Sequence, residues 1–119
     1  MEVQVFGIKK SPDTRKALRF FSERRIRTHF VDFKERGPSL GELKRFAQKF
    51  GLTALIDRES ARYAELGLKH SRLSDERWIE LLCNEPLVLR MPLTRSGSLL
   101  SIGLNKDQWR QWVDDDKAL

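Results

Sequence analysis

The chain has 119 residues and a formal net charge of +6; hydrophobic residues make up 39% of it and charged residues 34%. This length fits one domain, and the composition excludes a disordered or low-complexity protein. No apolar stretch reaches the roughly 20 residues that cross a bilayer, and the N-terminus lacks the apolar core of a signal peptide, so we expect a cytoplasmic protein with no membrane partner. A single cysteine, Cys83, excludes an internal disulfide and a cysteine-based metal site.

The first residues predict a short strand followed by a helix. Apolar and polar residues alternate before Gly7, which indicates a strand that ends there. Ser11-Pro12-Asp13 is a strong helix start. A serine accepts free N–H groups, a proline needs no donor at the first position, and an acidic side chain suits the positive end of the helix dipole. We expect this helix over residues 12–25.

A second strand is predicted over residues 28–33, which completes a βαβ unit at the front of the chain. Right-handed crossovers dominate in such units, so the two strands should be parallel. The chain is therefore expected to belong to the α/β class.

The middle of the chain, about residues 38–84, predicts a helical insertion. Ser39 and Glu42 have the spacing of a capping box, which opens a helix. The elements expected here are a helix from Ser39 to a glycine stop at Gly51, a helical turn at 60–66 and a helix from Ser74 to Asn84.

The last third predicts a hairpin and a closing helix. Residues 87–90 form an apolar run that we expect to be a strand. It should pair antiparallel with a strand at 99–102 across a turn at Ser96-Gly97. Asn105 is placed to cap the final helix. We expect helices on both faces of the resulting sheet.

Five stretches of the chain, in this order and spacing, resemble the arsenate reductase family, which includes the Spx-type transcription regulators. The stretches are FGIKKSPDTRKAL, VDFKERGPSLGELKRF, ALIDRESARYAELGL, EPLVLRMPL and SGSLLSIGLNKDQWRQWV, and they span nearly the whole chain. The resemblance implies a thioredoxin-like, glutaredoxin-like fold. We expect one such domain over residues 1–119, with a four-stranded mixed sheet and the helical insertion.

The resemblance also shows what the chain lacks. The family places its catalytic cysteine at the start of the first helix, where this chain has Ser11, and Thr14 occupies the second position of a Cys-x-x-Cys pair. A helix N-terminus stabilises a thiolate, whereas a serine hydroxyl needs an adjacent base. We therefore expect no catalytic residue here, and the plainer alternative is that Ser11 only caps the helix.

The arsenate-binding arginines of the family map to Asp57, to Met91 and to a position near Ile102, with Arg58 and Arg90 one residue away from the first two. The resemblance makes Pro92 a cis-proline that exposes the preceding backbone to an extended peptide; a plain strand-edge proline is the alternative. The expected site is a degenerate one for an anion or a peptide. It comprises Ser11, Thr14, Arg15, Arg58, Arg90 and Pro92.

Basic residues concentrate around the first helix. Arg15, Lys16 and Arg19 lie in its first two turns, where cations oppose the helix dipole, so we assign them to binding rather than to folding. With Lys9 and Lys10 they predict a weak site for sulfate, phosphate or an acidic peptide. An idle, solvated surface is the alternative. No RNA-recognition or zinc-finger pattern accompanies these residues, so we do not expect a nucleic-acid partner.

Three functions remain open on this sequence. The first, which we favour, is a non-catalytic binding or regulatory protein with an acidic protein partner. The second is an oxidoreductase that binds glutathione or another small thiol at Pro92, and the third is an Spx-type regulator that contacts RNA polymerase. We otherwise expect no cofactor. The histidines His29 and His70 lack the spacing of a metal site, and Cys83 falls on an apolar helix face, which favours packing over catalysis.

Overall fold

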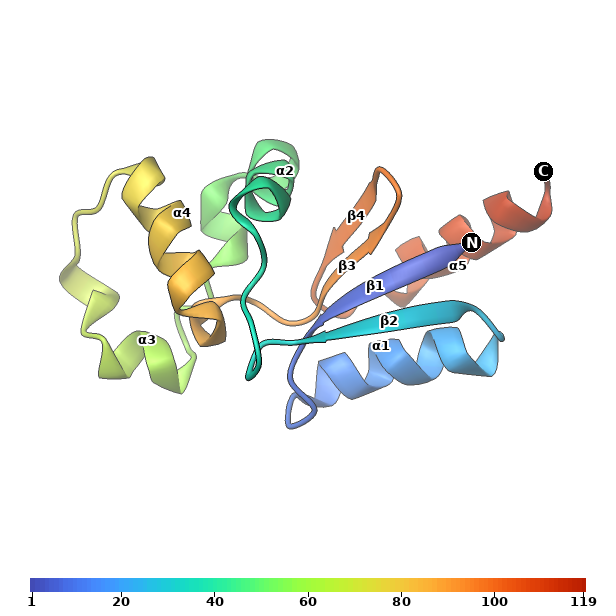
Figure 1. The fold of residues 1–119 in the computed structure, drawn as a ribbon, viewed down its shortest axis with the longest axis horizontal. Coiled ribbons are helices and arrows are strands. Elements are labelled where there is room, and N and C mark those ends of the chain that lie inside the picture. The colour runs from blue at the N-terminus through green and yellow to red at the C-terminus, as the bar shows by residue number, and fades with distance from the viewer. The chain divides into compact units, whose positions relative to one another are not determined.

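The structure is a computed structural model that describes all of residues 1–119. It contains two compact units. The first comprises Met1–Asp32 and Met91–Leu119, and the second comprises Phe33–Arg90. The first is a sheet with two helices and the second is a group of helices (Figure 1). The second unit contains the helical insertion expected at about 38–84, and the expectation that the whole chain is one domain stays a prediction.

The first unit is built on a four-stranded mixed sheet in the order β2-β1-β3-β4. The central strand β1 (Glu2–Gly7) pairs with β2 (Arg27–Asp32) in parallel, as the βαβ pattern predicts. On its other side β1 pairs antiparallel with β3 (Leu93–Ser96), which in turn pairs antiparallel with β4 (Leu99–Ile102). Gly97 in the tight turn between them has a φ of 60°, a conformation that favours glycine.

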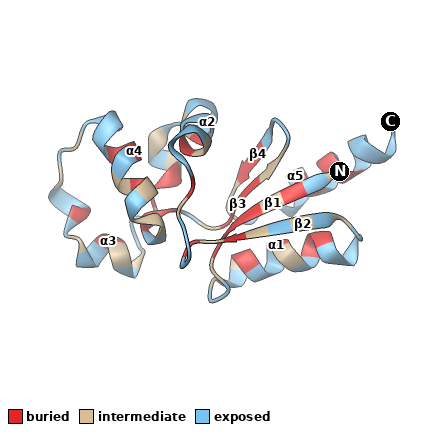
Figure 2. Ribbon diagram, in the orientation of Figure 1, coloured by how far each residue is buried: buried red, intermediate tan, exposed pale blue.

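Two helices pack on one face of this sheet. They are α1 (Pro12–Glu23) and α5 (Lys106–Lys117). Both contribute to one core with the alternate β1 residues Val3 and Val5. The expectation of helices on both faces of the sheet stays a prediction. The buried members of the core are Val3, Val5, Ala17, Phe20, Phe21, Trp109, Trp112 and Val113. Figure 2 shows buried segments in red on β1, α1 and α5.

Trp109 is the centre of this core. Its side chain is fully buried, and its ring centroid lies 5.5 Å from that of Phe20 and 5.4 Å from that of Phe21. Its indole N–H donates a hydrogen bond of 2.8 Å to the Oγ of Ser101 in β4. The one polar atom of the side chain is thus satisfied inside the core, as buried tryptophans require.

The predicted strand at 87–90 is wrong. Residues Pro86–Val88 form a 3₁₀ turn, and Leu89 makes a single antiparallel bridge with Ile56. The strand that pairs with β4 is β3, which lies further along the chain. Val88 and Leu89 are buried, and a short apolar run looks the same in sequence whether it becomes a strand or a buried turn.

The second unit contains three α-helices, α2 (Leu40–Phe50), α3 (Ala61–Glu65) and α4 (Asp75–Asn84). The predicted capping box is present, because the Glu42 N–H donates to Ser39 Oγ at 3.1 Å and the Ser39 N–H donates to Glu42 Oε1 at 2.8 Å. Ser74 caps α4, as its position at the predicted helix start indicates, and Ser60 caps α3. No helix in the chain combines the length and the apolar composition needed to cross a membrane.

Candidate functional site

The six residues predicted for the site divide between the two units. The first unit holds Ser11, Thr14, Arg15 and Pro92, and the second holds Arg58 and Arg90. The start of α1 brings the first three together.

Ser11 is the N-cap of α1. Its backbone is extended, and its Oγ accepts a hydrogen bond of 3.2 Å from the N–H of Thr14. Its own N–H donates to the carbonyl of Ile8 at 3.1 Å, which closes the loop after β1. The Ser11 hydroxyl is therefore in contact with a main-chain donor and not with a base that could ionise it.

The start of α1 keeps one free main-chain donor. Pro12 has no N–H, while the N–H groups of Thr14 and Arg15 donate to the Oγ and the carbonyl of Ser11, at 3.2 and 3.1 Å. The N–H of Asp13 remains, on a residue that carries a carboxylate. Anion sites at helix starts use several free N–H groups. The donor set is thus smaller than the sequence suggests.

Thr14 is a packing residue. Its side chain is fully buried and its Oγ1 has no hydrogen-bond partner. A Cβ added at Gly7 would collide with this hydroxyl, so the absence of a side chain at Gly7 lets α1 approach the end of β1. At the second position of the Cys-x-x-Cys pattern, this chain thus has a buried threonine that packs α1 against the end of β1.

Arg15 takes part in folding, contrary to the assignment of the basic helix residues to binding alone. Its Nη1 donates a hydrogen bond of 2.7 Å to the carbonyl of Lys9, which fastens the loop to the helix. Lys9, Lys10, Lys16 and Arg19 are exposed and form no ion pair. These four cations make up what we call the basic face of the first unit.

Pro92 lies at the start of β3 and is buried. The peptide bond between Met91 and Pro92 is cis, as the resemblance implies. The Pro92 carbonyl accepts a hydrogen bond of 2.8 Å from the N–H of Gly103. Because Leu93 pairs with Phe6, Pro92 lies beside the carboxyl end of β1, from which the loop to α1 begins.

Arg58 and Arg90 are not brought together within the second unit. The segments that carry them run antiparallel: the Arg90 N–H donates to the carbonyl of Leu55 at 2.9 Å, and the Asp57 N–H donates to that of Val88 at 2.8 Å. Arg90 is at one end of this pairing and Arg58 follows the other end. The Arg58 side chain is engaged instead with the hydroxyl of Tyr63, at 3.2 Å.

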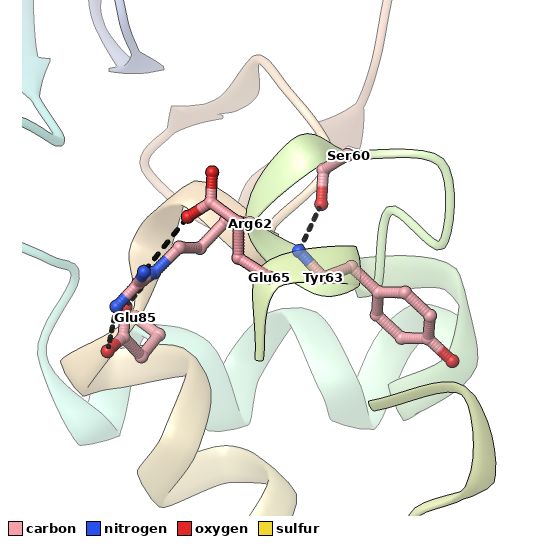
Figure 3. Close-up of polar contacts among 5 residues, drawn as sticks. All are labelled: Ser60, Arg62, Tyr63, Glu65 and Glu85. Carbon is pink, nitrogen blue, oxygen red and sulfur yellow. Dashed lines mark hydrogen bonds and ion pairs between the residues drawn. The ribbon is translucent and has the colours of Figure 1, made fainter. Parts of the chain in front are cut away.

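The most extensive ion-pair cluster of the second unit centres on Arg62, which sequence reasoning missed (Figure 3). Its Nε and Nη2 donate to the two carboxylate oxygens of Glu85 at 2.8 and 2.9 Å, and its Nη1 donates to Glu65 at 3.0 Å. The hydrogen bonds with Glu85 raise the pKa of Arg62 and lower the pKa of Glu85. The cluster joins α3 to the end of α4, and its partners Arg62 and Glu85 are 23 positions apart in the chain, so no local pattern predicts the contact.

Replacing Glu85 by glutamine is expected to destabilise the protein at pH 7 and to have less effect in acid. The native Glu85 pKa is lowered, so its contribution is present above about pH 4.3, the ordinary glutamate pKa, and is lost as the pH falls through the lower native value. Denaturant unfolding at pH 7 and pH 3 measures this difference. The loss is modest, because the Glu85 side chain is 31% exposed and solvent screens the pair.

Glu59→Gln is the matched control, because Glu59 is an exposed carboxylate of the same unit that forms no ion pair. An equal pH-dependent loss in both variants would contradict the role given to the Arg62 hydrogen bonds.

The remaining candidates do not form a reactive site. Cys83 is half-buried, and burial, followed by the charge of Glu42, raises the pKa of its thiol, so little thiolate forms at neutral pH. The His29 ring nitrogen lies 3.7 Å from the carboxylate of Glu2 on the exposed side of the sheet edge. No group of three or more His, Cys, Asp or Glu side chains is placed to hold a metal ion.

The chain matches one known protein family over most of its length. The model of the ArsC family matches residues 6–112. The chain belongs to the ArsC family. This is the arsenate reductase family that the sequence resembles. The uncharacterized protein YusI of Bacillus subtilis (strain 168) is 27% identical over 115 residues, which cover 93% of this chain and 98% of YusI.

Solved structures give the same fold for this ArsC-family chain. The YFFB (PA3664) protein has a TM-score of 0.82 at 22% identity, over 92% of this chain and 96% of that protein. An arsenate reductase from Vibrio cholerae has a TM-score of 0.79 at 24% identity, over 93% of this chain and 97% of that enzyme. The predicted thioredoxin-like α/β fold with a four-stranded mixed sheet is therefore confirmed.

Proposed function

We propose that this ArsC-family chain is a non-catalytic binding protein that holds an acidic protein partner on the basic face of its first unit. The observation that carries the proposal is the state of Ser11. Its hydroxyl accepts the N–H of Thr14 within a helix cap, with no base in contact to make it a nucleophile. The chain's only thiol, Cys83, has a raised pKa and is half-buried, so it does not replace the missing cysteine.

The basic face supports the binding half of the proposal. Lys9, Lys10, Lys16 and Arg19 project from one loop and the first two turns of α1, and none is neutralised by an ion pair. Exposed cations of this kind attract an acidic surface over about one Debye length and set the rate of its association. A free inorganic anion is less suited to the site than an acidic peptide, because the helix start offers it one main-chain donor.

A hexaglutamate peptide titrated into the ¹⁵N-labelled protein tests the binding. We expect saturable amide shifts over residues 9–19 that weaken steeply when the salt concentration rises, because salt screens exposed charges. The double variant Lys16→Glu/Arg19→Glu should abolish these shifts. Lys69→Glu/Arg72→Glu is the matched control, because it changes the same charge on exposed residues of the second unit. If the two double variants reduce the amide shifts equally, the basic face is not the binding site and the proposal is wrong.

A second arm tests the absence of catalysis. With glutathione and glutaredoxin supplied, we expect arsenate reduction by the purified protein to equal the blank, and Cys83→Ser to change nothing. Turnover above the blank would overturn the non-catalytic part of the proposal, whether or not it persists in Cys83→Ser, and would leave the binding result standing.

A further inference from the structure

The second unit carries a groove that none of the predicted site residues line. It lies between α2 and α4 and encloses about 300 Å³. Its lining residues are Leu40, Lys44, Asp75, Glu76, Ile79 and Glu80. The volume is at the lower limit of the roughly 300–1,000 Å³ of small-molecule sites. The groove therefore suits one or two side chains of a partner better than a cofactor.

The floor of the groove is apolar. Ile79 is 8% exposed and belongs to the core of the unit, while Leu40 is 46% exposed at the first position of α2. The capping box of Ser39 and Glu42 already satisfies this helix start, so the exposed leucine is not needed to begin the helix. A leucine left half in solvent beside a buried isoleucine offers an anchor for an apolar side chain.

The rim of the groove is acidic. Asp75, Glu76 and Glu80 are exposed carboxylates on α4, and Lys44 on α2 is the one cation of the lining. None of the four forms an ion pair. Asp75 and Glu76 favour the helix start through its dipole, but Glu80 lies beyond the first turn, where this effect has faded.

This local excess of negative charge is opposite in sign to the chain as a whole, whose net charge is +6. It disfavours nucleic acid and acidic peptides at this place and favours a cationic ligand with an apolar side.

We propose that the groove between α2 and α4 binds a basic amphipathic helix of a partner protein. An apolar side chain of that helix lies on Leu40 and Ile79, and its lysine or arginine side chains face Glu76 and Glu80. This is the helix-in-groove mode, in which an apolar stripe supplies contact area and flanking charges select the ligand. The proposal does not depend on the basic face of the first unit, which selects ligands of the opposite charge.

The test titrates the ¹⁵N-labelled full chain with a synthetic amphipathic helix of leucine and lysine, and separately with the same pattern in which glutamate replaces lysine. We expect saturable shifts at Leu40, Lys44 and residues 75–80 with the lysine peptide alone. Glu76→Gln/Glu80→Gln should raise its dissociation constant about three- to tenfold, as expected for two solvent-exposed charge pairs. Leu40→Ser should weaken it as well, through the lost apolar contact.

Glu35→Gln/Glu59→Gln is the matched control, since it removes two exposed carboxylates of the same unit that do not line the groove. All these positions are exposed, and unchanged spectra away from the substitutions verify that each variant is folded. The proposal is overturned if the control weakens binding as much as the groove variant, if Leu40→Ser has no effect, or if no saturable shift occurs at the groove. Concentration-dependent shifts of the groove residues without peptide would show a second copy of the chain there, and would also overturn it.

Discussion

Replacing Trp109 by alanine is expected to lower the free energy of unfolding by about 3–5 kcal/mol, the cost typical of removing a buried tryptophan. The side chain is fully buried against Phe20 and Phe21, and it supplies the hydrogen-bond donor to the buried Oγ of Ser101. Its loss leaves both a cavity and an unpaired hydroxyl. Whole domains are stable by only about 5–15 kcal/mol, so denaturant unfolding should show a greatly reduced midpoint.

Two variants separate the contributions to this loss. Trp109→Phe keeps most of the apolar contact and removes the donor to Ser101, so its cost should be smaller. Lys106→Ala changes an exposed residue of the same helix and should alter stability by no more than about 0.5 kcal/mol. A loss in Trp109→Ala no greater than in Lys106→Ala would contradict the central place of Trp109 in the core.

Replacing Gly7 by alanine is expected to cost about 1–3 kcal/mol, the range for overpacking a well-packed interior. The new methyl group collides with the hydroxyl and the methyl of Thr14, and Thr14 is fully buried, so its side chain has no solvent-filled space to move into. Either β1 or the start of α1 must shift. Thermal and denaturant unfolding measure the loss, and amide shifts around Ser11 report the movement of the helix start.

A double-mutant cycle tests the named contact. Thr14→Ala removes both colliding atoms, so the Gly7→Ala/Thr14→Ala variant should be more stable than the sum of the two single changes predicts. Gly41→Ala is the control, because a Cβ there meets no atom within 4 Å and alanine favours a helix interior. Additive effects in the cycle would show that the cost at Gly7 arises elsewhere.

Local chemistry made much of this fold predictable. Ser11, Ser39, Ser60 and Ser74 each cap a helix that the sequence places within one or two residues of its observed start. These signals act between residues three positions apart, so they can be read without the fold. The parallel pairing of β1 and β2 follows from the predicted helix between them, because a helical crossover returns the chain to the end of the sheet where β1 began.

Tertiary contacts decided what the sequence could not. The run at 87–90 is apolar because it is buried in the second unit, and no periodicity distinguishes that from a strand. The contact between Arg62 and Glu85 joins residues far apart in the chain, and the hydrogen bond from Arg15 to Lys9 depends on the path of a loop. At the candidate site, residue types were predictable, whereas the number of free N–H groups at the start of α1 required the observed hydrogen bonds.

The segment between β2 and β3 leaves the sheet and re-enters it at the same end. Asp32 pairs with Gly7 and Leu93 pairs with Phe6, so β2 ends and β3 begins at the same end of β1, two strand spacings or roughly 10 Å apart. Residues 33–90 thus form one connection between β2 and β3, and the two ends of this connection lie close together. Loop-closure entropy grows with the logarithm of length, by about 0.6 kcal/mol per doubling. A change in the number of residues between Asp32 and Met91 therefore adds little to the entropic cost of bringing β2 and β3 to the same end of β1.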